Sequence, residues 1–215
     1  MKLYYHPLST YSQKTLMAFH EKGVSFTPEF VDLMNPEGRA AYKKLYPLVK
    51  VPLLVLDDGW FIPESSIIIE YLDTHFVSGP RLIPEDKDQA RRTRFHDRQF
   101  DLYVNEPFQK IFFDGMLPEA ERDPKGVAAA KERLDTMYTY FEKHFAKNTW
   151  ALGDAFSMAD CAAAPCLAYL SSTYPFEAFP NIKAYWGRLA ERPSFKKVLA
   201  EAEPHLAKMM GGARR

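Results

Sequence analysis

The first part of the chain changes repeatedly between the hydrophobic period of a strand and that of a helix. Residues 2–6 and 24–32 predict two short strands, and Pro28 favours an edge position for the second. Between them, residues 10–22 place apolar side chains at helical spacing, and Gly23 supplies a helix stop. The order predicts a strand–helix–strand unit.

The alternation continues as far as residue 76. Residues 35–48 predict a helix or a loop, and residues 51–62 predict two strands around Asp58-Gly59, a strong hairpin signal. Residues 63–76 carry an apolar helical face that follows a pair of serines suited to capping. We therefore expect a small mixed sheet with helices packed on it.

After this region, a stretch rich in glycine, proline and charge predicts a linker, and the rest of the chain is helical in pattern. Pro107 is expected to bend the first of these helices, and the last five residues, GGARR, are expected to be disordered. The expected helices span residues 88–113, 124–146, 157–171, 181–191 and 194–203. The sequence thus predicts an α+β protein with a βαβ-ββα domain at residues 1–77, a linker at 78–88 and an all-α domain at 89–215.

Composition excludes several function classes. The chain has 215 residues with 28 basic and 28 acidic side chains, a balance that argues against nucleic acid or a membrane surface as a partner. Its two cysteines predict no disulfide framework, and no spacing typical of metal ligands appears. No apolar run approaches the length of a membrane span. We expect a cytoplasmic protein without a metal.

The segment Ser9-Thr10-Tyr11-Ser12 places hydroxyls where a helix begins. A helix N-terminus favours an anion, and a thiolate held there has a lowered pKa. The segment has no cysteine, so a thiolate would have to come from a ligand, with Ser9 as the best-placed donor. The alternative is that Ser9 only caps the helix, a contribution of about 1 kcal/mol.

Two further segments have the character of ligand sites. Pro52 begins a strand, and a cis Val51-Pro52 bond would turn the backbone of Val51 outward for a ligand, although most such bonds are trans. Glu64 and Ser65 stand at the start of another helix, where an anion and an ammonium could both be held. Capping alone is the alternative for this pair.

In this order, the three segments resemble the glutathione transferase superfamily, in particular its serine-type, bacterial-like cytosolic members. The matching stretches are HPLS at the first helix, KVPLL at the third strand, and ES followed by an apolar helix ending in YL. The resemblance covers essentially the whole chain and implies a thioredoxin-like N-terminal domain followed by a helical one. The glutathione-binding residues that it implies are Ser9, Lys50, Val51, Pro52, Glu64 and Ser65.

One family motif concerns folding, and two positions depart from the pattern. Ser157 and Asp160 form the expected N-capping box of a helix, with Phe156 available for a hydrophobic staple. Val49 stands where the family commonly has glycine, which leaves the local backbone shape and the reach of Lys50 open. Serine rather than cysteine at the first helix argues against glutathione-dependent reductase chemistry.

The resemblance implies a homodimeric glutathione S-transferase of the detoxification type, which ionises the thiol of glutathione for attack on an apolar electrophile. Ser9 is the expected activating residue, with Tyr5 and Tyr11 as alternatives, whereas Ser12 is expected to face the interior. The helical domain is expected to form the acceptor pocket, for which His96, Phe100 and Tyr103 are candidates or else core residues. A glutathione-dependent isomerase, lyase or dehalogenase, and a non-catalytic member that binds glutathione or a protein, remain alternatives.

Overall fold

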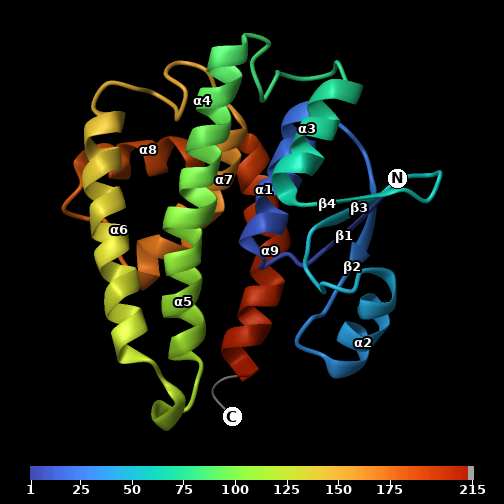
Figure 1. The fold of residues 1–215 in the computed structure, drawn as a ribbon, viewed down its shortest axis with the longest axis horizontal. Helices are drawn as coiled ribbons and strands as arrows, with labels where there is room; N and C mark the ends of the chain where they lie inside the picture. Colours follow the sequence, from blue (N-terminus) through green and yellow to red (C-terminus); the bar gives the residue numbers. More distant parts are fainter. Residues whose placement is uncertain (213–215) are drawn as a thin grey trace. The chain divides into compact units, whose positions relative to one another are not determined.

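The computed structural model describes residues 1–212, and the chain divides into two units. The N-terminal unit comprises Met1–Arg81 together with Pro193–Arg215, and the helical unit comprises Leu82–Arg192. Figure 1 shows the strands and helices of each unit. Within residues 1–212, no helix combines the length and the apolar character needed to cross a membrane.

The N-terminal unit is built on a four-stranded mixed sheet in the order β2-β1-β3-β4. β1 pairs parallel with β2 and antiparallel with β3, and β3 pairs antiparallel with β4. β2, the strand that contains Pro28, lies at an edge of the sheet, as expected because proline has no backbone N–H to donate. The elements are β1 (Lys2–Tyr5), α1 (Thr10–Lys22), β2 (Thr27–Phe30), α2 (Pro36–Leu45), β3 (Leu53–Val55), β4 (Phe61–Pro63) and α3 (Ser65–His75).

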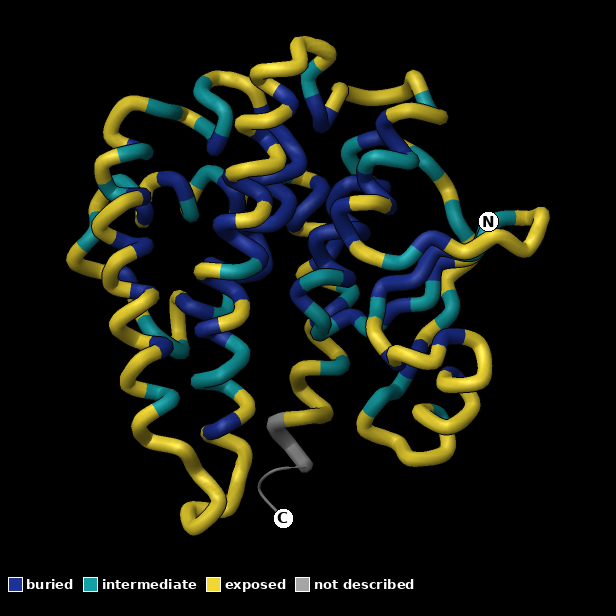
Figure 2. The backbone as a smooth tube through the Cα atoms, in the orientation of Figure 1, coloured by how far each residue is buried: buried dark blue, intermediate teal, exposed yellow. Residues whose placement is uncertain are grey.

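Alternation along β1 supplies a core on each side of the sheet. Leu3 is fully buried on the side opposite Tyr4, and the helices α1 and α3 of this unit pack against each other. Tyr4 points the other way and lies 6.0 Å from Tyr42 of α2, ring centre to ring centre. Figure 2 shows that buried residues gather in α1 and along the central strands. The expected α+β architecture is confirmed.

A buried ion pair joins α1 and α3. The Lys22 ammonium at the end of α1 lies 3.0 Å from the Asp73 carboxylate of α3 and 3.3 Å from the Pro80 carbonyl. Both charged side chains are almost completely buried, so removing either partner would leave an uncompensated buried charge.

The last helix, α9 (Pro193–Gly212), packs against α1 within the N-terminal unit, whereas the sequence grouped it with the helical domain. Phe195, Val198 and Ala202 of this helix are buried, and Glu201 accepts a hydrogen bond from the Tyr5 hydroxyl. The helix also continues through Pro204, where the sequence predicted an end. The ring faces the carbonyl of Ala200, and both residues are exposed, so water can compensate for the lost backbone bond.

α9 also includes Gly211 and Gly212, two of the five residues expected to be disordered. The other three, residues 213–215, lie outside the described residues.

The helical unit contains the elements that the sequence predicted, with one irregular segment. A π-helical stretch, Gln99–Asn105, separates α4 from α5, and Pro107, at which the sequence predicts a bend, sits in the first turn of α5. The remaining elements are α4 (Lys87–Arg98), α5 (Glu106–Gly115), a 3₁₀ turn (Glu119–Glu121), α6 (Pro124–Phe145), α7 (Met158–Thr173) and α8 (Pro180–Ala190).

The N-capping box predicted at the start of α7 is present. The Asp160 carboxylate accepts hydrogen bonds from the Ser157 backbone and hydroxyl through one oxygen, at 2.8 and 3.0 Å. Its other oxygen accepts from the Ala151 backbone at 2.8 Å and from the Tyr185 hydroxyl at 2.7 Å. The box therefore joins two other stretches of the helical unit, at Ala151 and at Tyr185, to the start of α7.

Candidate functional site

The strand register brings the three predicted ligand segments to one end of the sheet. Tyr4 of β1 lies opposite Leu53 of β3, and Leu53 lies opposite Pro63 of β4. The chain leaves β1 into the turn before α1, enters β3 through Val51-Pro52, and leaves β4 into Glu64 and Ser65. All three segments thus extend from the same row of residues.

The turn between β1 and α1 is held by backbone and side-chain hydrogen bonds. The Ser9 amide donates to the His6 carbonyl at 2.9 Å, and the Leu8 amide donates to Nδ1 of His6 at 3.1 Å. The Gln13 side chain donates to the Pro7 carbonyl at 2.7 Å. These bonds fix the position of Ser9 at the start of the helix.

Ser9 is the N-cap of α1, and its Oγ accepts from the Ser12 amide at 3.3 Å. A hydroxyl that accepts in this way retains its own proton for donation. Capping and donation to a ligand are therefore compatible roles, and the accepted bond polarises the O–H group toward donation. The side chain is half-buried, so a ligand can reach it.

The positive end of α1 is not neutralised by an acid of its own. The first turn of the helix contains no Asp or Glu. In addition, the buried Lys14 ammonium donates to Oγ of Ser66 in the first turn of α3, at 2.8 Å. Two helix N-termini and a buried cation thus contribute positive potential to the region around this end of the sheet.

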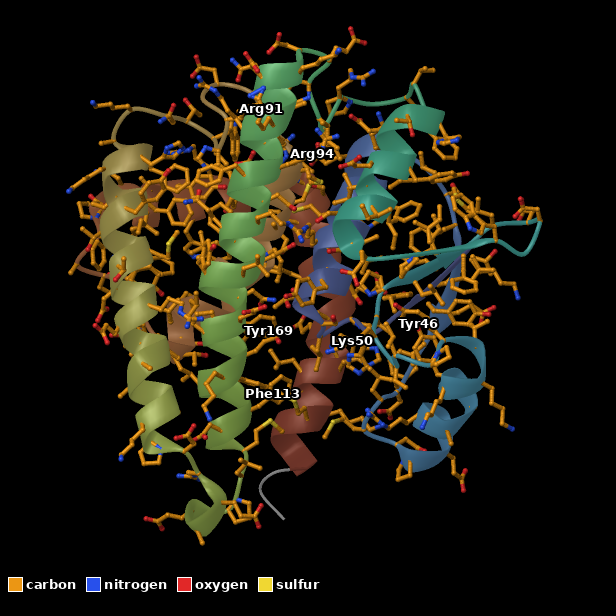
Figure 3. The ribbon with its side chains drawn as sticks, in the orientation of Figure 1. Tyr46, Lys50, Arg91, Arg94, Phe113 and Tyr169 are labelled. Carbon is orange, nitrogen blue, oxygen red and sulfur yellow. The ribbon has the colours of Figure 1, made fainter. Side chains whose placement is uncertain are left out.

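The segment before β3 has the shape that the resemblance implied. The Val51-Pro52 bond is cis, and the hydroxyl of Tyr42 donates to the Lys50 carbonyl at 2.7 Å. Val49 has φ of +53°, a left-handed conformation that is rare for a β-branched residue and in which glycine is at ease. The chain thus keeps a glycine-like backbone shape despite the valine. Lys50 is exposed and is labelled beside this segment in Figure 3.

Glu64 is also held in an unusual backbone conformation, with φ of +70° and ψ of +119°. It is the N-cap of α3 but makes no side-chain cap bond, so its exposed carboxylate is not committed to the helix. Ser65 is buried in the first helical turn. Strained residues of this kind cluster at ligand-binding segments, where the surrounding structure maintains them.

The other hydroxyls considered for thiol activation lie in different surroundings. Tyr5 is buried and donates its hydroxyl to Glu201 of α9, and burial together with this carboxylate raises its pKa strongly. Ser12 is fully buried and its Oγ accepts from the His6 amide, as expected for a residue that faces the interior. Tyr11 is half-buried in the first turn of α1.

The three residues predicted for the acceptor pocket all lie in the helical unit, but in unlike positions. Phe100 is buried and stacks on Phe141 with ring centres 4.5 Å apart. His96 is buried, its Nδ1 lies 2.9 Å from Oε1 of Gln99, and burial lowers its pKa. Tyr103 is 47% exposed, so it alone of the three presents a large surface for a ligand.

Aromatic side chains continue along α5 toward α7. Phe108 stacks on Tyr169 at 5.3 Å, and Phe113 is exposed; Figure 3 labels the latter two. Among the described residues, no group of three or more His, Cys, Asp or Glu side chains is arranged to hold a metal ion.

Comparison with known protein families identifies both parts of the chain. The model for the glutathione S-transferase N-terminal domain matches residues 8–75, and that for the glutathione S-transferase C-terminal domain matches residues 104–193. The chain belongs to the glutathione S-transferase family. Its two matched regions contain the three ligand segments and the capping box described above.

Individual relatives support this membership over most of the chain. Glutathione S-transferase A of Pleuronectes platessa is 32% identical, with 88% of this chain and 79% of the relative covered. A stringent starvation protein A homolog of Coxiella burnetii is 29% identical, with 98% and 97% covered. A glutathione S-transferase from Methylobacillus flagellatus KT, solved with glutathione bound, superposes with a TM-score of 0.83 at 27% identity, covering 92% of this chain and 98% of that one.

Sequence reasoning missed two polar residues near the predicted segments. Lys14 was not singled out, although it shares a helical face with the buried Met17 and Ala18, which is an available signal. The sequence predicts its partner, Ser66, only as a helix cap. A lysine on the same helical face as apolar residues either extends its ammonium to solvent or buries it against a polar partner. Only the contact with Ser66, which is distant in sequence, decides between the two.

Proposed function

We propose that this family member is a glutathione S-transferase in which Ser9 and the N-terminus of α1 lower the pKa of the glutathione thiol. The observation that carries the proposal is the state of that helix end. Ser9 caps it through one long bond at 3.3 Å and keeps a proton to donate, while the first helical turn contains no acid. Hydrogen bonding and positive potential both favour a bound thiolate.

The remaining segments suit the other charged and polar groups of glutathione. The backbone N–H groups at the start of α3, at Ser65, would donate to the γ-glutamyl carboxylate, and the Glu64 carboxylate would hold the neighbouring ammonium. The backbone of Val51, turned by the cis bond, would pair with the cysteinyl unit. The exposed Lys50 would reach the glycine carboxylate.

In the proposed reaction, the thiol proton passes to solvent and the sulfur lone pair forms a new bond to an electrophilic carbon. The leaving group departs with its electron pair. Ser9 contributes by stabilising the thiolate, and the binding segments contribute by holding the sulfur in position. An apolar acceptor would contact the helical unit, in which Tyr103 is the most exposed of the candidates His96, Phe100 and Tyr103. A homodimeric state and a cytoplasmic location belong to the same proposal.

The test is the pH dependence of the thiolate absorbance of bound glutathione in the wild type and in Ser9→Ala. A hydrogen bond to a charged group contributes about 1.5–3 kcal/mol, so its loss should raise the thiol pKa by roughly 1–2 units. Ser9→Thr keeps both a hydroxyl and a capping residue and serves as the matched control. Equal thiol pKa values in the wild type and Ser9→Ala, with glutathione bound in both, would refute the role of Ser9.

A non-catalytic glutathione-binding protein is the second candidate, because one relative that spans almost the whole chain is named a stringent starvation protein homolog rather than a transferase. It predicts binding of glutathione with no turnover of any electrophile. A glutathione-dependent isomerase or dehalogenase would share the binding segments, so cyclic keto acids and halogenated substrates should be tested beside aryl chlorides.

A further inference from the structure

The turn that presents Ser9 depends on an imidazole. Nδ1 of His6 accepts a hydrogen bond from the backbone amide of Leu8, two residues further on, at 3.1 Å. Asp and Asn commonly make this bond in turns, through a side-chain oxygen at the equivalent position. The carbonyl of the same residue accepts from the Ser9 amide at 2.9 Å, so His6 holds the turn through both its side chain and its backbone.

The partner fixes the protonation state of this ring. A backbone N–H can only donate, so Nδ1 must carry a lone pair and the proton of the neutral ring must sit on Nε2. A protonated imidazole has N–H groups at both positions and no lone pair to offer. The bond to Leu8 therefore exists only while His6 is neutral.

The surroundings of His6 favour the neutral form. Burial lowers its pKa, the nearby His205 lowers it further, and Asp32 acts in the opposite direction. His205 belongs to α9, and the two imidazole centres lie 6.0 Å apart. Phe30, at the end of β2, lies 5.2 Å from each of the two rings. The titratable groups that act on His6 are thus Asp32, which follows β2, and His205 of α9.

We propose that His6 is a positioning residue for thiol activation: its unprotonated Nδ1 holds the Leu8 amide and thereby keeps the Ser9 hydroxyl directed at the glutathione sulfur. This inference rests on the proposed function of Ser9. Protonation of His6 places an N–H group against the Leu8 N–H and opens the turn. Acid then weakens thiolate formation twice, by protonating the sulfur and by releasing Ser9.

The decisive comparison is between His6→Asn and His6→Leu, measured on the full-length protein between pH 5 and 8. Asparagine retains an acceptor at the position of Nδ1 but does not titrate, whereas leucine removes the acceptor at every pH. The readouts are the thiolate absorbance of bound glutathione and the kcat and KM for glutathione with an activated aryl chloride. Far-UV circular dichroism verifies that each variant is folded.

If His6 positions Ser9, the wild type loses thiolate more steeply on acidification than a single ionisation allows, and His6→Asn reduces the dependence to one ionisation while retaining activity. His6→Leu should lower kcat by about tenfold near neutral pH, equal to about one pKa unit of thiol, with a smaller change in KM. A wild-type acid limb that is already a single ionisation, one that stays equally steep in His6→Asn, or an unchanged kcat in His6→Leu, overturns the proposal.

A second measurement tests the hydrogen bond from the Leu8 amide to His6 without any enzyme activity. In the ligand-free protein, nitrogen-15 NMR of the histidine rings should show the proton of His6 on Nε2 and a titration that the Leu8 amide shift follows. In His205→Asn the midpoint of that titration should rise, because a neighbour that lowers the pKa has been removed. If glutathione is never ionised in the wild type, the proposed function fails, whereas a proton on Nδ1 at neutral pH refutes the hydrogen bond itself.

Discussion

Two helices of this chain, α1 and α7, have a serine as their N-cap, but the two helix ends are completed in different ways. At the start of α7, Ser157 and Asp160 form a reciprocal capping box that is buried on all sides. At the start of α1, Ser9 is half-buried and accepts a single bond from the Ser12 amide. The same residue type thus occupies the same helical position in two unlike environments.

The two helix N-termini differ in whether the protein itself supplies a carboxylate to the positive end of the helix. The α7 end contains its own carboxylate, Asp160, whose two oxygens accept four hydrogen bonds from the protein. The first turn of α1 contains no acid. A helix end that is neutralised from within is a folding element, and one left without a counter-charge is suited to an anionic ligand.

A histidine supports each region, and the direction of its hydrogen bond differs. Nε2 of His144 lies 3.0 Å from the Ala151 carbonyl, so this ring donates and the bond survives protonation. His6 accepts from Leu8, so protonation removes that bond. Burial lowers the pKa of both histidines. The comparison indicates that the α7 box is insensitive to the charge of its histidine, whereas the turn before Ser9 is sensitive.

The largest expected effect is a loss of stability at the N-terminus of α7, where Asp160 supplies the negative charge. Asp160→Ala leaves the donors of Ser157, Ala151 and Tyr185 buried without an acceptor, at roughly 1–3 kcal/mol for each group. We expect a loss of about 3–5 kcal/mol in the free energy of unfolding, measured with urea, and an unchanged thiol pKa of bound glutathione.

Asp160→Asn is the matched control. Its carbonyl can still accept from Ala151 and Tyr185, while its amide faces the Ser157 amide, so the loss should be smaller. A shifted thiol pKa in folded Asp160→Asn would show that the two helix ends are not independent, and the comparison between them would fail.

An acid introduced into the first turn of α1 should change the thiol pKa of bound glutathione, with a smaller energetic effect than the loss of stability expected for Asp160→Ala. Tyr11→Glu places a carboxylate in the first helical turn, which should raise the thiol pKa by about one unit through like-charge repulsion and lower the thiolate fraction about tenfold near pH 7. Tyr11→Gln supplies the same shape without charge. If Tyr11→Gln raises the thiol pKa as far as Tyr11→Glu does, the Tyr11 hydroxyl, and not the empty helix end, activates the sulfur.

The order of elements could be predicted because each change in hydrophobic period coincides with a real boundary. The capping box was predictable for a similar reason, since Ser157 and Asp160 interact within one helical turn. Local sequence patterns could not show that α9 continues through Pro204 or that α9 packs against α1. Which unit a terminal helix joins depends on contacts distant in sequence.

The candidate site was predictable to the level of its segments. Ser9, Val51 and Glu64 stand at element ends, and the strand register alone brings those ends together. The left-handed backbone of Val49 could not be predicted, because valine disfavours that conformation. Nor could the hydrogen bond that the Leu8 amide donates to His6, because turns of this kind are commonly made by Asp or Asn. Such exceptions are held in place by the surrounding fold.

The smallest effect distinguishes the two serines as caps. Ser157→Ala removes a hydroxyl within a buried network and should cost about 1–2 kcal/mol of unfolding free energy, whereas Ser9→Ala removes one 3.3 Å bond at a half-buried position and should cost about 0.5–1 kcal/mol. Urea unfolding of both variants beside the wild type measures the two losses. Equal losses would mean that Ser9 is as much a structural cap as Ser157. A small loss of unfolding free energy in Ser9→Ala, combined with a raised thiol pKa, would mean that Ser9 acts mainly on the ligand, because Ser9 contributes little to the stability of α1.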